Sequence, residues 1–136
     1  MNDASAAPDP GIAERFSVGQ QARMERTVTE DAVAAFVALT GDDNPMHVDE
    51  QFARESGIGG RVVHGMLTAG YVSTVIGTML PGPGAIWLTQ QFNFRHPVRI
   101  GDEILIEAEV KRISVATSVL VLEIKVTNQA LSLIHI

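Results

Sequence analysis

The stretch HGMLTAGYVSTVIGTML, residues 64–80, decides the fold. Its apolar residues recur on more than one side of a helix, which is typical of a helix that is largely buried. The sequence PGPG at residues 81–84 follows directly and ends the helix, because proline and glycine interrupt helical structure. We therefore predict one long helix in the centre of the core.

Downstream of this helix the apolar residues change from helical spacing to alternation. Residues 104–111 and 120–127 each show one apolar and one mostly polar face, which is typical of antiparallel strands with one core face. Ala85–Phe94 predicts an earlier strand. Together these elements indicate an α+β architecture. The residues expected to face the core are Ile104, Ile106, Ala108, Val110, Leu120, Leu122, Ile124 and Val126.

The region before the long helix contains shorter elements. The pattern predicts a short strand at Ala22–Val28. A helix is expected to begin after Thr29, a favourable N-cap residue, and to end near Gly41. A second short helix is expected at Asp49–Ser56, before a group of glycines.

The length of 136 residues suits one domain with one core. Residues 1–11, which are rich in Asp, Ala and Pro, predict a flexible tail. Residues 12–136 are then a single domain. After Asn128-Gln129 one more strand of about eight residues is expected. The chain instead ends with ALSLIHI at residues 130–136, which is either a foreshortened strand or a non-native end.

Composition excludes several classes of function. The formal net charge of −6 argues against nucleic acid as a partner, because phosphate binding needs a surplus of Lys and Arg. The absence of cysteine excludes disulfides and thiol nucleophiles. No apolar run approaches the ~20 residues that span a bilayer, and the N-terminus does not resemble a signal peptide. We therefore expect a cytoplasmic protein without a membrane partner.

The loop after the first predicted helix carries the first candidate site. Asp42 and His47 lie on either side of a turn, in which Pro45 keeps Asn44 out of helical conformation. A carboxylate and an imidazole that converge on one point can hold a water molecule and transfer its protons. The same residues also suit a purely structural turn with a solvated histidine. A third alternative is a metal site with Asp42, His47 and Asp49 as ligands.

The start of the long helix carries the second candidate site. N–H groups at a helix N-terminus have no intrahelical acceptor and favour a developing negative charge. Gly65 has no side chain, so a carbonyl or thioester oxygen can approach its N–H closely. The alternative is structural: Gly65 allows tight packing, and His64 caps the helix or fills the core.

The two segments together carry a resemblance to a known family. Phe36–His47, with Ala53 six residues on, resembles the hydratase-2 signature of the MaoC-like (R)-specific enoyl-CoA hydratases. The shared features are an aromatic residue, a glycine, and Asp, Asn, Pro and His at fixed spacing. Val63–Leu67 resembles the Val-His-Gly start of the family's central helix. The similarity extends from about residue 17 to about residue 128.

The resemblance implies a hot-dog fold, in which an antiparallel sheet wraps around a long central helix, and a homodimer. It implies a hydro-lyase that adds water reversibly to a trans-2-enoyl-CoA and gives the (R)-3-hydroxyacyl-CoA. Asp42 would then be the base toward the water, His47 would orient the water, and Asn44 would brace the loop. The Gly65 N–H would stabilise the enolate-like thioester oxygen. Neither a cofactor nor a metal ion is expected besides the acyl-CoA substrate.

The sequence leaves several alternatives open. The acyl tunnel is expected to include Met66, Leu67, Tyr71 and Trp87, and acyl carrier protein is an alternative to coenzyme A. Four arginines are either CoA phosphate ligands or ordinary surface residues: Arg54, Arg61, Arg95 and Arg99. The pathway is polyhydroxyalkanoate supply, β-oxidation or another part of fatty acid metabolism.

Two other functions are compatible with a hot-dog fold. The first is an acyl-CoA thioesterase, although such enzymes usually place an acid on the central helix and residues 68–80 contain no Asp or Glu. The second is an acyl-thioester-binding subunit without activity. An intact pair of Asp42 and His47 argues against the second.

Overall fold

The computed structural model of the chain describes residues 11–130 and 133–135. Residues 1–10 of the predicted tail, and residues 131, 132 and 136 of the C-terminal stretch, lie outside the described residues. The elements follow one another as α1 (Ile12–Arg15), β1 (Gln21–Thr27), α2 (Glu30–Thr40), α3 (Pro45–Val48), α4 (Glu50–Glu55), α5 (Gly65–Thr78), β2 (Glu103–Ser114), β3 (Val119–Asn128) and β4 (Leu133–His135).

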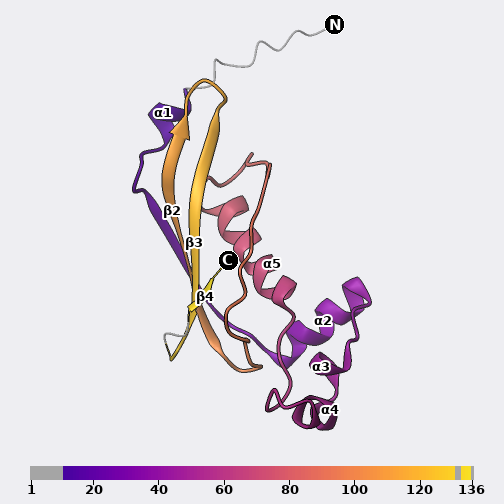
Figure 1. Cartoon of the computed structure of the whole chain (residues 1–136). Helices are drawn as coiled ribbons and strands as arrows, with labels where there is room; N and C mark the ends of the chain where they lie inside the picture. The colour runs from indigo at the N-terminus through magenta and orange to yellow at the C-terminus, as the bar shows by residue number, and fades with distance from the viewer. Residues whose placement is uncertain (1–10, 131–132, 136) are drawn as a thin grey trace, which may run out of the picture.

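The strands of the described chain form one antiparallel sheet in the order β1-β2-β3-β4 (Figure 1). β1 pairs with β2 although four helices lie between them in the sequence, and Met24 is the partner of Ile106. On the other side of β2, Ile106 is the partner of Val126 in β3. β4 adds a short pairing opposite 125–127. The predicted α+β architecture with an antiparallel sheet is confirmed.

One face of the sheet is apolar, as the alternation predicts. In β2 the four expected core residues are all buried. In β3 two of the expected residues are buried and two are half-buried against the same core. The buried residues are Ile104, Ile106, Ala108, Val110, Ile124 and Val126, and the half-buried ones are Leu120 and Leu122.

The long helix α5 lies across this apolar face (Figure 1). It buries one side, which consists of Thr68, Ala69, Val72, Val75 and Ile76. Its opposite side is exposed at Met66, Gly70, Ser73 and Gly77. The prediction that the helix is buried on most sides is therefore wrong for a single chain, because the sheet covers only one side of it.

The predicted strand at Ala85–Phe94 is not formed. This segment is extended chain without a ladder partner among the described residues. A strand needs a neighbour to accept and donate its backbone hydrogen bonds, and alternation alone does not supply one. Several of its apolar side chains are instead exposed, including Ile86 at 84% and Leu88 at 70%.

The short helices begin and end where local chemistry predicts. Thr29 accepts a hydrogen bond from the Ala32 N–H at 3.1 Å and caps α2, and Gly41, with φ at 76°, ends it in the left-handed region. Asp49 caps α4 through the Phe52 N–H at 3.0 Å. The additional helix α3 was not predicted. It begins at Pro45, which is favoured as the first residue of a helix.

The centre of the sheet provides a test of the core. Ile106 is 0% exposed and contacts β1 and β3 through its backbone partners. We expect Ile106→Ala to lower the free energy of unfolding by about 2–5 kcal/mol, because it leaves a cavity where packing is complete. Urea denaturation measures this. The control Val115→Ala, at a side chain that is 63% exposed, should change the value by less than about 0.5 kcal/mol.

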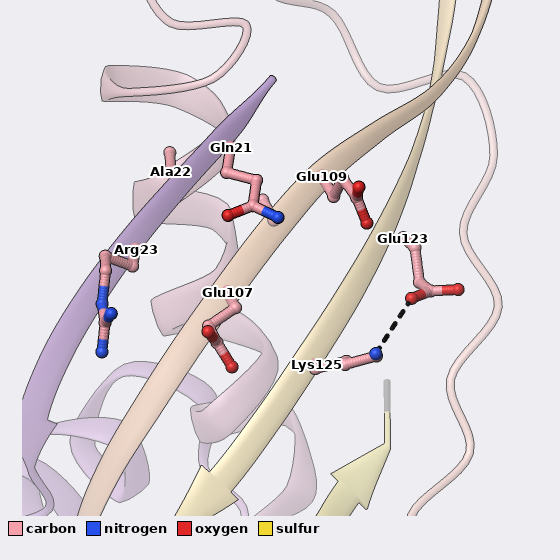
Figure 2. Close-up of a pocket in the computed structure, with 8 residues that line it drawn as sticks. Gln21, Ala22, Arg23, Glu107, Glu109, Glu123 and Lys125 are labelled. Carbon is pink, nitrogen blue, oxygen red and sulfur yellow. Dashed lines mark ion pairs between the residues drawn. The ribbon is translucent and has the colours of Figure 1, made fainter. Parts of the chain in front are cut away.

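The other face of the sheet is polar. Figure 2 shows side chains from three strands that stand on this face and line a shallow hollow, with α5 behind the sheet. The hydrogen bond from Lys111 lowers the pKa of Glu109 and raises the pKa of Lys111 itself. This hollow lies on a charged outer surface, away from both candidate sites. Among the residues described, no helix combines the length and apolar character needed to cross a membrane.

Candidate active site

The loop from Gly41 to His47 is held by hydrogen bonds between its own side chains and backbone N–H groups. Asp42 Oδ1 accepts a hydrogen bond from the Asn44 N–H at 3.3 Å, and Asn44 Oδ1 accepts one from the Met46 N–H at 3.0 Å. Asn44 is thereby the N-cap of α3, and Pro45 is the first helical residue. This arrangement fixes the direction in which α3 presents His47. It is a specific form of the bracing that was predicted for Asn44.

His47 is anchored through one ring nitrogen. Its Nδ1 lies 2.7 Å from the Val62 carbonyl oxygen. A carbonyl oxygen can only accept, so Nδ1 carries a proton, and in the neutral imidazole Nε2 then keeps a lone pair. His47 therefore presents a hydrogen-bond acceptor, and its orientation is set by a backbone group 15 residues away.

Asp42 and His47 converge, as predicted. An oxygen of the exposed Asp42 carboxylate and one ring nitrogen each of His47 and His64 lie within 4.8 Å of one another. Two hydrogen bonds of about 2.8 Å can span such a separation through one water molecule. A water held between the Asp42 carboxylate and an unprotonated nitrogen of His47 would donate a hydrogen to each, which would leave its lone pairs pointing away from both.

His64 is a buried residue of the site that sequence reasoning left as a cap or a core residue. It is 2% exposed, and its Nε2 donates to the Asp42 carbonyl oxygen at 2.9 Å. Its ring lies on the ring of His47, with centroids 3.8 Å apart, and contacts Phe36 at 4.6 Å. Because His64 is also the N-cap residue of α5, it joins the start of that helix to the loop.

The donors that gather here differ from the predicted metal set. Asp49 caps α4 and does not belong to the group of Asp42, His47 and His64. Nε2 of His64 is engaged with the Asp42 carbonyl, whereas its Nδ1 has no hydrogen-bond partner among the described residues.

Gly65 lies on the wall of a pocket of about 380 Å³. As the first residue of α5, it has an N–H without an intrahelical acceptor. A Cβ at this position would be 3.1 Å from Cε1 of Phe94, so any larger residue would press on this ring. The pocket is lined by His47, Val62, Val63, Gly65, Thr68, Phe94, Arg95, His96, Pro97 and Val98.

The pocket differs from the predicted acyl tunnel, because none of the four predicted residues lines it. Leu67 and Tyr71 pack against the core, whereas Met66 is 56% and Trp87 39% exposed. Instead, residues 94–98 form the opposite wall. Periodicity in the sequence carries no information about a wall made of irregular chain.

Two of the four arginines considered for CoA phosphates have partners within the fold. Arg61 donates to both carboxylate oxygens of Glu30, at 2.8 and 3.1 Å, and to the His47 carbonyl at 2.6 Å. Arg99 donates to the carbonyls of Gly60 and Ile58. These two side chains hold the backbone around the site.

The remaining two arginines are exposed. Arg54 pairs with Glu50 on α4, and this hydrogen bond together with the Arg61 backbone N–H lowers the pKa of Glu50. Arg95 lies at the pocket. Of the four arginines, Arg95 is thus the one that lines the pocket.

Arg61 connects α2, His47 and the loop before α5. Replacing it should therefore lower the free energy of unfolding by more than replacing a surface arginine. We expect Arg61→Leu to lower the free energy of unfolding by about 1.5–3 kcal/mol, the range for hydrogen bonds to charged groups. The matched control is Arg54→Leu, whose side chain is 71% exposed and whose solvent-screened ion pair should contribute little to stability. Equal losses in the two variants, measured by urea denaturation, would contradict this role.

Comparison with known proteins gives concordant results. The MaoC like domain family matches residues 15–130. The 3-hydroxybutyryl-CoA dehydratase of Methylorubrum extorquens is 44% identical over 71% of this chain and 62% of its own length. The (R)-specific enoyl-CoA hydratase of Rhodospirillum rubrum is 45% identical over 67% of this chain and 63% of its own length. The chain thus spans less than two thirds of both relatives.

A solved structure extends the comparison to the fold. The (R)-hydratase from A. caviae involved in PHA biosynthesis superposes with a TM-score of 0.84 and 38% identity. The match covers 88% of this chain and 90% of that protein. The predicted hot-dog fold is therefore confirmed.

Proposed function

Because the chain belongs to the family of MaoC-like domains, we propose that it is an (R)-specific enoyl-CoA hydratase. It would add water reversibly to a trans-2-enoyl-CoA and give the (R)-3-hydroxyacyl-CoA. One observation carries the proposal: an Asp42 carboxylate oxygen and a ring nitrogen of the anchored His47 lie close enough to share one water, and His47 and Gly65 line one pocket.

The geometry supports the following course of reaction. The water donates its hydrogens to Asp42 and His47 Nε2, and its lone pair attacks C3 of the enoyl group. The C3–O bond forms, one water O–H bond breaks with its proton passing to Asp42, and the C2–C3 double bond electrons move to the thioester oxygen. The Gly65 N–H stabilises the negative charge on that oxygen. The enolate then re-forms the thioester carbonyl as a new C2–H bond takes up one proton, and Asp42 gives up the proton that it gained, so that one water is added in total.

This reaction balances with water and thioester alone. We propose that it needs neither a cofactor nor a metal ion. The test is full activity of the purified protein after dialysis against EDTA, compared with an untreated sample. A loss of activity that Zn²⁺ or Mg²⁺ restores would contradict this part of the proposal.

The function itself is tested by the loss of enoyl absorbance with trans-2-enoyl-CoA substrates of increasing chain length, followed by chiral analysis of the product. We expect the (R)-3-hydroxyacyl-CoA. Release of free CoA thiol from a saturated acyl-CoA would indicate a thioesterase instead. Thermal stabilisation by acyl-CoA without turnover would indicate a binding subunit.

We further propose a homodimer, on the basis of apolar surface that the single chain leaves uncovered. Ile86, Leu88 and Phe94 are exposed on the unpaired segment, and Met66 is exposed on the open side of α5. A second copy that covers these residues would remove a large amount of apolar surface from water. Sedimentation equilibrium should give twice the mass of one chain, and a concentration-independent monomer would contradict the proposal.

Three narrower points stay predictions. Coenzyme A is the proposed carrier, with acyl carrier protein as the alternative, and the assay with both thioesters separates them. The preferred chain length of the substrate is the measurement that narrows the choice of pathway. The cytoplasmic setting expected from the sequence can be checked by cell fractionation.

A further inference from the structure

Thr68 carries a buried hydroxyl that the fold does not use. The residue is 1% exposed, and its Oγ1 has no hydrogen-bond partner in the part of the chain that the structure describes. A buried hydroxyl without a partner destabilises a folded protein, so such groups are rare and call for an explanation. Proteins accept this cost most readily at functional sites, where a ligand supplies the missing partner.

The position of Thr68 connects it with the pocket. It follows Gly65 by three residues on α5, and residues at this spacing share a helix face. Helical side chains lean toward the helix N-terminus, so the Thr68 side chain leans over the turn that contains Gly65. Both residues line the same pocket, together with His47.

Asp42 and the neutral form of His47, the two residues proposed to bind the water, do not donate a hydrogen bond to a substrate oxygen. The Asp42 carboxylate only accepts, and His47 Nε2 holds a lone pair because Nδ1 donates to Val62. Arg95 and His96, on the opposite wall, are exposed. Gly65, which is half-buried and lines the pocket, offers one N–H donor, and a thioester oxygen with developing charge can accept a second hydrogen bond.

We propose that the Thr68 hydroxyl is this second donor, and that it binds the thioester oxygen of the substrate beside the Gly65 N–H. The inference rests on the proposed hydratase function and assigns one more residue to its substrate site. The hydroxyl donates its hydrogen to the oxygen while the oxygen gains negative charge, and no bond to Thr68 is made or broken. Because the bond strengthens as the charge develops, Thr68 should affect kcat more than KM.

A structural role is the competing explanation, and it makes the opposite prediction for stability. His64 Nδ1 is also buried without a partner, one turn before Thr68. If the Thr68 hydroxyl bound this nitrogen directly or through a buried water, its removal would destabilise the free protein. If the hydroxyl is unpaired until substrate binds, its removal should leave the free protein as stable as before or more stable.

Thr68→Val and Thr68→Ser separate the two explanations, because valine keeps the shape and serine keeps the hydroxyl. For Thr68→Val we expect a melting temperature without ligand that is unchanged or raised, and a kcat for crotonyl-CoA that is about 10²-fold lower, as for loss of an oxyanion donor. Thr68→Ser should retain kcat within a few-fold. Thr74→Val, on the same helix but outside the pocket lining, is the matched control and should keep the parent kcat.

A kcat of Thr68→Val near that of the parent protein would overturn the proposal. So would a lowered melting temperature with a kcat that Thr68→Ser does not restore. Binding of butyryl-CoA, an unreactive saturated thioester, distinguishes this proposal from the hydratase function. If the parent protein hydrates no enoyl-CoA but binds butyryl-CoA at least several-fold more tightly than Thr68→Val does, the proposed function fails and the donor role of Thr68 stands. If it neither reacts with nor binds these thioesters, both fail.

Discussion

Asp42→Asn is expected to lower kcat for the hydration of crotonyl-CoA by about 10²–10⁴-fold, the range for removal of a general base. The substitution keeps the size of the side chain and the oxygen that accepts the Asn44 N–H. It removes the negative charge and one acceptor, so the water loses the group that takes its proton. Because binding of the acyl chain and thioester does not involve this carboxylate, KM should change by only a few-fold.

Asp43 provides the matched control for Asp42. It is an adjacent exposed acid whose backbone N–H bonds to the Gly41 carbonyl, and its side chain is not part of the converging group. Asp43→Asn therefore makes the same chemical change one residue away and should keep kcat within about three-fold. An Asp42→Asn variant as active as Asp43→Asn would show that Asp42 is not the base.

The second large effect is expected for His47→Asn, with a loss in kcat of similar size, about 10²–10⁴-fold. The Asn amide N–H₂ can take the place of Nδ1–H and donate to the Val62 carbonyl, so the anchor to the loop before α5 is retained. No atom of Asn reaches the position of Nε2. The variant thus removes the water acceptor while it keeps the main structural contact of the ring.

Two further variants interpret the His47 result. His47→Gln loses the anchor to Val62 but places an amide group near the position of Nε2, so partial activity would indicate that His47 mainly orients the water. His96→Asn changes the other histidine of the pocket, which is exposed, and should reduce kcat by no more than about three-fold. Unchanged pH profiles and parent activity in His47→Asn would remove His47 from the mechanism.

The parts of the site that could be predicted depend on neighbours within a few residues. Thr29, Gly41 and Asp49 begin or end helices through contacts no more than four residues away, so the sequence contains all of the information. The turn at Pro45 also depends on neighbouring residues and was predicted, although Pro45–Val48 form the short helix α3. Alternation likewise identified β2 and β3, because each strand pairs with its neighbour in sequence.

The parts that could not be predicted depend on distant partners. His64 meets the Asp42 carbonyl 22 residues away, and only the path of the chain between them decides that contact. Arg61 reaches Glu30 across 31 residues in the same way. The alternation in Ala85–Phe94 is the same whether or not a neighbouring strand exists, so the sequence predicted a strand that this chain does not pair.

The side chains that hold the site bind mainly to carbonyl oxygens of the backbone, and this has a consequence for how the protein can change. His47 is held by the carbonyl of Val62, and every amino acid offers the same oxygen at that position. Val62 also lines the pocket. Evolution or protein engineering can therefore change the side chain at this position, and with it the shape of the pocket wall, without removing the oxygen that holds His47.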